Sequence, residues 1–273
     1  MFTISCIQMN SNDVLEDNME QALILSSHTI NNGSDLICFP ENALLMPSSR
    51  DNLFSNSFEE NQNPCIEFFV DIAKKNNVWV LAGSLSIKIS NGKLFNRCYL
   101  INNKGDIEGY YDKIHLFDVS IPDGLTYKES DKYSSGSNAP VFQTPLANFG
   151  LTICYDIRFP NLYRDIAKHG ANVIFIPSAF TEFTGKLHWH ALLRSRAIET
   201  GSYIVAPAQT GKHIGGRKTF GHSIVVHPNG TILKDAGVDV GSIECTIDPK
   251  HVDNIRKQIP SLFLNSKYSI EVK

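Results

Sequence analysis

Short apolar runs alternate with longer segments of helical periodicity in the first third of the chain, and this alternation most restricts the possible folds. Runs rich in β-branched and aromatic residues, bordered by Gly, Asn or Pro, predict strands at residues 2–9, 35–39 and 78–87. Segments at residues 14–31 and 64–77 predict helices between them. Since a strand–helix–strand order favours right-handed crossovers and parallel pairing, the sequence predicts an α/β fold.

The same signals continue to the end of the chain. Further strands are predicted at residues 94–101, 107–111, 141–144, 150–153, 172–176, 203–208, 223–227, 231–234 and 241–247. Further helices are predicted at residues 161–169, 186–200 and 250–258. Turns at residues 103–105 and 228–230 predict hairpins. Because no linker, repeat or low-complexity tract separates these elements, we expect one domain over residues 1–273, with mixed sheets and helices on their outer faces.

Composition and simple motifs argue against several classes of function. The formal net charge is -3, which argues against a broad basic surface for nucleic acid. No apolar run reaches the roughly 18 residues of a membrane-spanning helix, and the N-terminus lacks a signal-peptide pattern, so we expect a cytoplasmic protein. Six cysteines occur without a CxxC pair, which favours reduced thiols over disulfides or a zinc site. No Walker phosphate loop occurs and no GxGxxG follows the first strand, which excludes two further enzyme classes.

Cys154 closes the apolar run at residues 150–153 and precedes a predicted helix. A strand-to-helix elbow leaves backbone N–H groups free, and with the positive helix end they lower the pKa of a thiol and can hold an oxyanion. Asp156 and Arg158 could pair to fix this elbow. The alternative is an inert buried thiol, the commonest state of a cysteine, and position alone leaves both interpretations open.

Glu41 and Lys113 follow two further strand ends. Pro40 ends the ladder pairing of the strand at residues 35–39, so Glu41 lies just past its C-terminal end, where α/β sheets place their sites. Partial burial there would raise the pKa of the carboxyl group and let it shuttle protons. Lys113 follows two tyrosines, and a lysine held there can donate to the oxygen that becomes negative in a tetrahedral intermediate. A solvated glutamate and a surface lysine are the alternatives.

A thiol, a carboxylate and an ammonium at three strand ends form a coherent set for acyl transfer. The thiolate attacks an amide carbon, an acid protonates the leaving amine, and water then hydrolyses the thioester. The sequence therefore predicts cleavage of a carbon–nitrogen bond in a small molecule. Residues 115–140 follow Lys113 directly and are poor in regular pattern, so we expect them to form a functional loop.

The strings around these three residues resemble the nitrilase, or carbon–nitrogen hydrolase, superfamily. They read Phe39-Pro40-Glu41-Asn42, Tyr111-Asp112-Lys113-Ile114-His115 and Ile153-Cys154-Tyr155-Asp156. Their order and local sequences are highly specific in combination, and the resemblance covers nearly the whole chain. It implies an αββα sandwich with no metal or organic cofactor. It also implies a homodimer, with the helices at residues 161–169 and 186–200 as candidate interface elements.

The resemblance also implies a role for each residue. Glu41 would act as general base and later as acid, Lys113 would stabilise the tetrahedral intermediate, and Cys154 would be acylated. Glu129 matches the family's second glutamate and would orient the lysine and the substrate. The backbone N–H of Tyr155 would be the second donor to the oxyanion.

Segments in the second half of the chain resemble the amidase branch of the superfamily, at residues 177–189, 193–200 and 217–223. They are most similar to amidases that hydrolyse deaminated glutathione to 2-oxoglutarate and cysteinylglycine. The near alternative is ω-amidase activity on 2-oxoglutaramate or 2-oxosuccinamate. Both reactions cleave the ω-amide of an α-keto acid. Asn161 and residues 121–128 depart from the pattern near the pocket, which bears on the substrate rather than on the chemistry.

Four residues are predicted to contact the substrate: Tyr155, Phe180, Thr181 and Arg217. Arg217 can meet the carboxylate of an anionic substrate bidentately, with a solvated basic loop as the alternative. His222 suggests a Cys–His hydrolase, but the family pattern gives the base role to Glu41, and we interpret His222 as a structural donor. The remaining alternative is a catalytically idle interaction module, in which Cys154 is unreactive.

Overall fold

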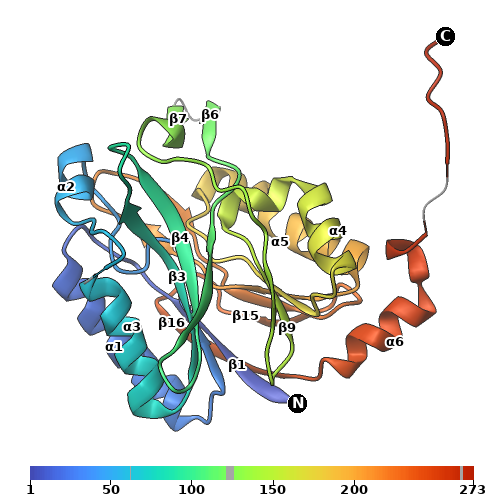
Figure 1. Ribbon diagram of the computed structural model, residues 1–273, viewed down its shortest axis with the longest axis horizontal. Helices are drawn as coiled ribbons and strands as arrows, with labels where there is room; N and C mark the ends of the chain where they lie inside the picture. The colour runs from blue at the N-terminus through green and yellow to red at the C-terminus, as the bar shows by residue number, and fades with distance from the viewer. Residues whose placement is uncertain (62, 121–125, 265–266) are drawn as a thin grey trace.

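Two six-stranded sheets lie face to face in the computed structural model, which describes residues 1–61, 63–120, 126–264 and 267–273 (Figure 1). In spatial order, the first sheet consists of β16 (Gly241–Ile247), β1 (Phe2–Gln8), β2 (Leu36–Cys38), β3 (Trp79–Lys88), β4 (Leu94–Ile101) and β5 (Ile107–Asp112). The second consists of β15 (Ile232–Asp235), β14 (Ile224–Val226), β11 (Tyr203–Ala206), β10 (Val173–Phe175), β9 (Asn148–Leu151) and β8 (Val141–Gln143).

Parallel strands form the centre of each sheet. In the first sheet β1, β2 and β3 pair in parallel, with α1 (Leu15–Asn31) and α3 (Pro64–Asn76) in the crossovers. In the second, β9, β10 and β11 pair in parallel, with α4 (Pro160–Lys168) and α5 (Glu182–Thr200) in the crossovers. Antiparallel strands complete both sheets at their edges. The predicted mixed sheets are therefore confirmed.

Alternate residues of the central strands face two different cores. Ile4 and Cys6 of β1 belong to the core between the sheets, whereas Ile7 belongs to the core that includes α1 and α3. Phe2 and Phe149 bridge the two sheets, with ring centroids 6.1 Å apart. Burial on both faces explains why β2 and β10 are continuous apolar runs in the sequence. Helices α1 and α3 cover one outer face and α4 and α5 the other, so the αββα sandwich is confirmed (Figure 1).

Gly83 of β3 permits an unusually close approach between two strands. A Cβ atom at this position would lie 2.1 Å from the backbone oxygens of both Phe39 and Pro40. No other residue type fits without displacing that backbone. Glu41 is the next residue along the chain, so the absence of a side chain at Gly83 sets where Glu41 can lie.

Several elements differ from the expectations. Helix α5 begins at Glu182, four residues earlier than predicted. The sequence does not predict α2 (Arg50–Ser55), nor the ribbons of β6 (Asp118–Ser120) with β7 (Thr126–Lys128) and β12 (Thr210–Lys212) with β13 (Lys218–Phe220). These strands have three residues each and carry polar side chains, so no apolar alternation marks them.

The segment at residues 115–140 contains β6, β7 and the 3-10 turn η1 (Glu129–Asp131), so it is more regular than predicted. Residues 121–125, where the sequence departs from the family pattern, lie outside the described residues. The chain continues beyond the sheets with α6 (Lys250–Gln258) and the 3-10 turn η3 (Pro260–Leu262). Among the described helices, none is both long and apolar enough to cross a bilayer.

Candidate active site

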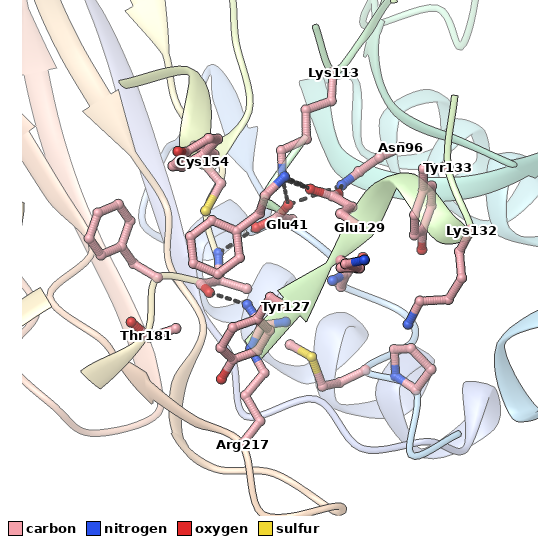
Figure 2. Close-up of a pocket in the computed structure, with 18 of the residues that line it drawn as sticks. Glu41, Asn96, Lys113, Tyr127, Glu129, Lys132, Tyr133, Cys154, Thr181 and Arg217 are labelled. Atoms are coloured by element: carbon pink, nitrogen blue, oxygen red, sulfur yellow. Dashed lines mark hydrogen bonds and ion pairs between the residues drawn. The ribbon is translucent and has the colours of Figure 1, made fainter. Parts of the chain in front are cut away.

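Three segments that are far apart in sequence meet at one cavity of about 280 Å³ (Figure 2). Glu41 follows β2, Lys113 follows β5 and Cys154 follows β9, and all three line this cavity. Glu129, on the turn η1, lines it as well. Strand ends of the two sheets, together with the turn η1, thus bring together the four residues that the sequence predicts to be catalytic.

Lys113 lies between two carboxylates. Its Nζ is 2.8 Å from Glu41 Oε1 and 2.9 Å from Glu129 Oε2. Asn96 Nδ2 donates to the Oε1 atoms of both glutamates, at 3.0 Å each. The backbone N–H of Ala179 donates to Glu41 Oε2 at 2.8 Å. Both carboxylates are therefore held in fixed orientations around one ammonium group.

Asn96 is a site residue that the sequence does not reveal. It is 3% exposed and lies within the apolar strand β4. A polar side chain buried in such a run needs partners, and here the partners are Glu41 and Glu129. An asparagine and an arginine within a mostly apolar strand were the only local signal available.

The ion pairs set the pKa values of Glu41 and Lys113. Burial alone would raise the pKa of Glu41, but the ammonium of Lys113 outweighs it, so this pKa lies below its ordinary value. The expectation of a raised pKa for Glu41 is therefore wrong. Burial opposes the charged form of Lys113, but Glu129 and Glu41 raise its pKa well above the ordinary value. Glu41 is therefore ionised at neutral pH and able to accept a proton.

Cys154 opens the 3-10 turn η2 (Cys154–Arg158) with a positive φ of 47°. Its thiol lies near the carboxylate of Glu41, close enough for each group to affect the pKa of the other. Burial, and then the negative charge of Glu41, raise the pKa of this thiol. The predicted lowering of the thiol pKa by the elbow is therefore wrong, because desolvation and a carboxylate outweigh the backbone dipoles. The resting nucleophile is a protonated thiol beside an ionised base.

Asp156 fixes the elbow, but with partners other than Arg158. Its carboxylate accepts hydrogen bonds from Ile153 N at 2.9 Å, His115 N at 3.0 Å and the Tyr111 hydroxyl at 2.7 Å. Two of these donors flank Lys113 in sequence. The Cys154 turn and the Lys113 segment are thus joined through one buried carboxylate.

Arg158 turns away from Asp156. Its guanidinium lies 3.4 Å from His188 Nδ1 and 5.2 Å from the centroid of the Phe180 ring. The predicted pairing of Asp156 with Arg158 is therefore wrong.

Comparison with known proteins identifies the family. Residues 3–257 match the family model described as carbon–nitrogen hydrolase. The chain belongs to the carbon–nitrogen hydrolase family. A deaminated glutathione amidase from Synechocystis sp. is 38% identical to this hydrolase, over 96% of this chain and 97% of its own. Human omega-amidase NIT2 is 30% identical, over 100% and 98% of the two chains.

A solved structure shares the fold of this hydrolase. The NitFhit protein of C. elegans superposes with a TM-score of 0.87 at 33% identity, over 95% of this chain and 63% of that chain. The predictions of the superfamily, of the αββα fold and of a hydrolase are therefore confirmed.

The four predicted substrate-binding residues of the hydrolase, Tyr155, Phe180, Thr181 and Arg217, all line the cavity. Arg217 Nη2 donates to the carbonyl oxygen of Ala179 at 2.5 Å, and its guanidinium lies 5.8 Å from the centroid of the Tyr127 ring. Among the described residues its buried Nε has no hydrogen-bond partner. A buried, unpaired guanidinium N–H group beside the reacting residues can receive an anionic oxygen.

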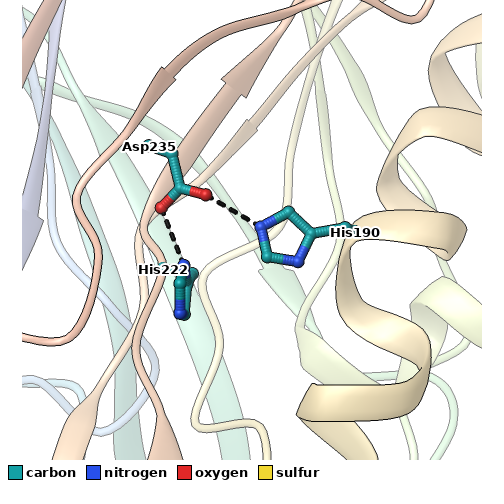
Figure 3. Close-up of side chains that lie close together, drawn as sticks. All are labelled: His190, His222 and Asp235. Atoms are coloured by element: carbon teal, nitrogen blue, oxygen red, sulfur yellow. Dashed lines mark hydrogen bonds and ion pairs between the residues drawn. The ribbon is translucent and has the colours of Figure 1, made fainter.

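His222 does not line this cavity. Its Nδ1 lies 2.9 Å from Asp235 Oδ1, while His190 Nε2 lies 2.8 Å from Asp235 Oδ2 (Figure 3). Within the described residues these three are the one group of His, Cys, Asp or Glu side chains close enough to hold a metal ion, with ligand atoms within 4.8 Å of one another. The two histidines engage both carboxylate oxygens of Asp235. Because His190 belongs to α5 and Asp235 to β15, the cluster links these two elements, which fits a structural role for His222.

Proposed function

We propose that this hydrolase cleaves the ω-amide of an α-keto acid through a thioester on Cys154. The observation that carries the proposal is that one buried carboxylate, Glu41, is ion-paired with the ammonium of Lys113 and lines the same cavity as the thiol of Cys154. A nucleophile, a base and an electrophilic cation around one cavity are the groups that acyl transfer from an amide requires.

In the acylation step, Glu41 accepts the thiol proton as the Cys154 sulfur bonds to the amide carbon. The carbonyl oxygen becomes negative, and the ammonium of Lys113 and the backbone N–H of Tyr155 stabilise it. Glu41 then gives the proton to the amide nitrogen, the carbon–nitrogen bond breaks, and the amine leaves. The acyl group remains on sulfur as a thioester.

In the deacylation step, water replaces the amine. Glu41 takes a proton from the water molecule, whose oxygen bonds to the thioester carbon, and the carbon–sulfur bond breaks. The proton returns to the sulfur, and the carboxylic acid is released. Glu129 and Asn96 act as positioning residues, since they hold Lys113 and Glu41 in place throughout both steps.

We propose deaminated glutathione as the substrate, with 2-oxoglutarate and cysteinylglycine as products. The similarity to an amidase named for this compound supports the choice. The acyl-side carboxylate would bind Arg217, whose positive charge lies close enough to Glu41 to lower the pKa of that carboxyl group. Phe180, Thr181 and Tyr155 would form the surrounding walls.

The test is a comparison of kcat/KM for deaminated glutathione and for 2-oxoglutaramate, with products identified by mass spectrometry. We expect deaminated glutathione to be preferred by about tenfold or more. A clear preference for 2-oxoglutaramate would instead assign the ω-amidase reaction to this chain.

We further propose that residues 1–273 form one catalytic domain that acts as a cytoplasmic homodimer without a cofactor. All six cysteines are free and buried, which suits a reducing compartment. Leu187 and Ile198 of α5 are 63% and 54% exposed, as expected of an interface helix. Light scattering should give twice the chain mass of 30.4 kDa, and chelators should leave turnover unchanged.

A further inference from the structure

The cavity carries more positive charge than the reaction needs. Its charged lining consists of Glu41, Glu129, Lys113, Lys128, Lys132 and Arg217. Lys113 is paired with both carboxylates. The other three cations therefore leave the described part of the cavity with an excess of positive charge, which favours an anionic ligand with more than one charged group.

Lys132 is the most notable of these cations. It directly follows the turn η1, where its backbone N–H donates to the carbonyl of Glu129 at 3.0 Å and its carbonyl accepts from the N–H of Leu94 at 3.0 Å. Its backbone is thus fixed three residues from a carboxylate that holds Lys113. No carboxylate of the described residues lies within ion-pair distance of its ammonium, which is directed into the cavity (Figure 2).

The two cations Lys132 and Arg217 lie on different sides of the cavity (Figure 2). Arg217 is held against Ala179, the residue whose N–H donates to Glu41, so its charge lies beside the reacting groups. Lys132 lies farther along the cavity, away from Cys154 in this view. Arg217 therefore lies nearer to the reacting groups than Lys132 does.

We propose that Lys132 binds a carboxylate on the amine side of the scissile amide, while Arg217 binds the carboxylate on the acyl side. This inference rests on the proposed function. The substrate class is an amide with two carboxylates, one at each end. A leaving group of two extended residues spans about 7 Å, so its terminal carboxylate needs a second cation at some distance from the one that binds the acyl side. A flexible ammonium group suits a carboxylate that can approach from several directions.

Lys128 is the other cation that lines the cavity, and it lies opposite Asp118 in the β6–β7 ribbon. Its charge acts on Asp118, across the β6–β7 ribbon, and helps to lower the pKa of that carboxyl group. Lys132 is not opposite a carboxylate in a strand pair, and its ammonium has no ion-pair partner among the described residues, so we take it as the receptor. A carboxylate site at Lys132 would also explain a preference for deaminated glutathione over 2-oxoglutaramate. The latter releases ammonia and has no carboxylate on the amine side.

The test combines a change in the protein with a change in the ligand. Binding of deaminated glutathione and of its C-terminal amide is measured by calorimetry in the Cys154→Ala protein, with and without Lys132→Met. We expect amidation of the ligand to weaken binding about tenfold when Lys132 is present and less than twofold in Lys132→Met. Lys132→Arg should retain most of the difference, and Lys104→Met, in an exposed turn, should retain all of it.

Each result decides the inference. The inference is wrong if amidation of the ligand weakens binding equally with and without Lys132. It is also wrong if amidation no longer weakens binding in Lys128→Met but still weakens it in Lys132→Met. No binding of deaminated glutathione at all would overturn it as well. The proposed function is tested separately by turnover of the unaltered enzyme, so tight binding that depends on Lys132 without turnover would contradict that function alone.

Discussion

Lys113 Nζ and Glu41 Oε1 lie 2.8 Å apart in an ion pair whose side chains are 2% and 4% exposed. A charge buried to this extent is stable only while its partner is present. The contact therefore supports both the fold and the proposed chemistry, and a substitution at either residue should change both.

Lys113→Met should lower stability as well as activity. It leaves the buried carboxylate of Glu41 and the partly buried carboxylate of Glu129 without their cation, which should cost about 3–5 kcal/mol in the free energy of unfolding at pH 7. It should also reduce kcat by about 10² or more, because the developing oxyanion loses a donor. Urea denaturation and steady-state kinetics measure the two effects, with Lys104→Met as the control.

The stability effect of Lys113→Met should depend on pH. Because the folded-state pKa of Glu41 lies below its ordinary value of about 4.3, the pair contributes stability above that pH and loses it as the pH falls through the folded-state pKa. The difference between the two proteins should therefore shrink below about pH 4. Equal unfolding free energies at pH 7 would contradict this account of the site.

Glu41→Gln separates the proposed base from the histidine alternative. The amide keeps the shape of the side chain but accepts no proton, so kcat should fall by about 10²–10⁴. His222→Ala should keep kcat within about threefold, because His222 lies outside the cavity lining. The opposite pattern would indicate a Cys–His hydrolase.

Cys154 should be the site of covalent reaction. Iodoacetamide should label it once per chain, and Cys154→Ala should abolish both this label and turnover. Because burial and Glu41 raise the pKa of the thiol, the labelling rate should keep rising from pH 6 to pH 9. Peptide mass spectrometry gives the position and the rate. Turnover that survives in Cys154→Ala would exclude the thioester mechanism.

Asp235→Asn should weaken the link between α5 and β15 without affecting catalysis. Burial alone would raise the pKa of Asp235, but the hydrogen bond with His190 and its other donors lower it. The contribution is therefore present above the ordinary carboxyl pKa of about 3.9 and is lost as the pH falls through the folded-state pKa. We expect a loss of about 1 kcal/mol at neutral pH, limited by partial solvent exposure. Asp239→Asn is the exposed control for the same urea measurement.

The layers of the fold could be predicted from the sequence because local apolar patterns show which segments are buried. Strand β2 and the first residues of β3 are apolar on both faces, and α3 begins with Pro64 after an asparagine cap. The ribbons β6–β7 and β12–β13 carry no such signal. Their short polar strands depend on pairing with distant segments, such as the bridge between Thr181 and Thr219, and a local sequence pattern does not reveal such pairing.

The positions of the reactive residues were predictable, but their protonation was not. Strand ends and motif strings locate Glu41, Lys113 and Cys154. The pKa of Glu41 depends on a lysine 72 positions away, and that of Cys154 on a glutamate from another strand. Asn96 was missed for the same reason, since its two partners come from distant segments.

The raised pKa of Cys154 also bears on how such an enzyme survives in the cell. Peroxides attack thiolates far faster than thiols. The thiol of Cys154 keeps its proton at rest and loses it only when an amide carbon comes within bonding distance. It should therefore stay reduced during oxidative stress. The desolvation that makes the sulfur a poor nucleophile at rest is then what protects it.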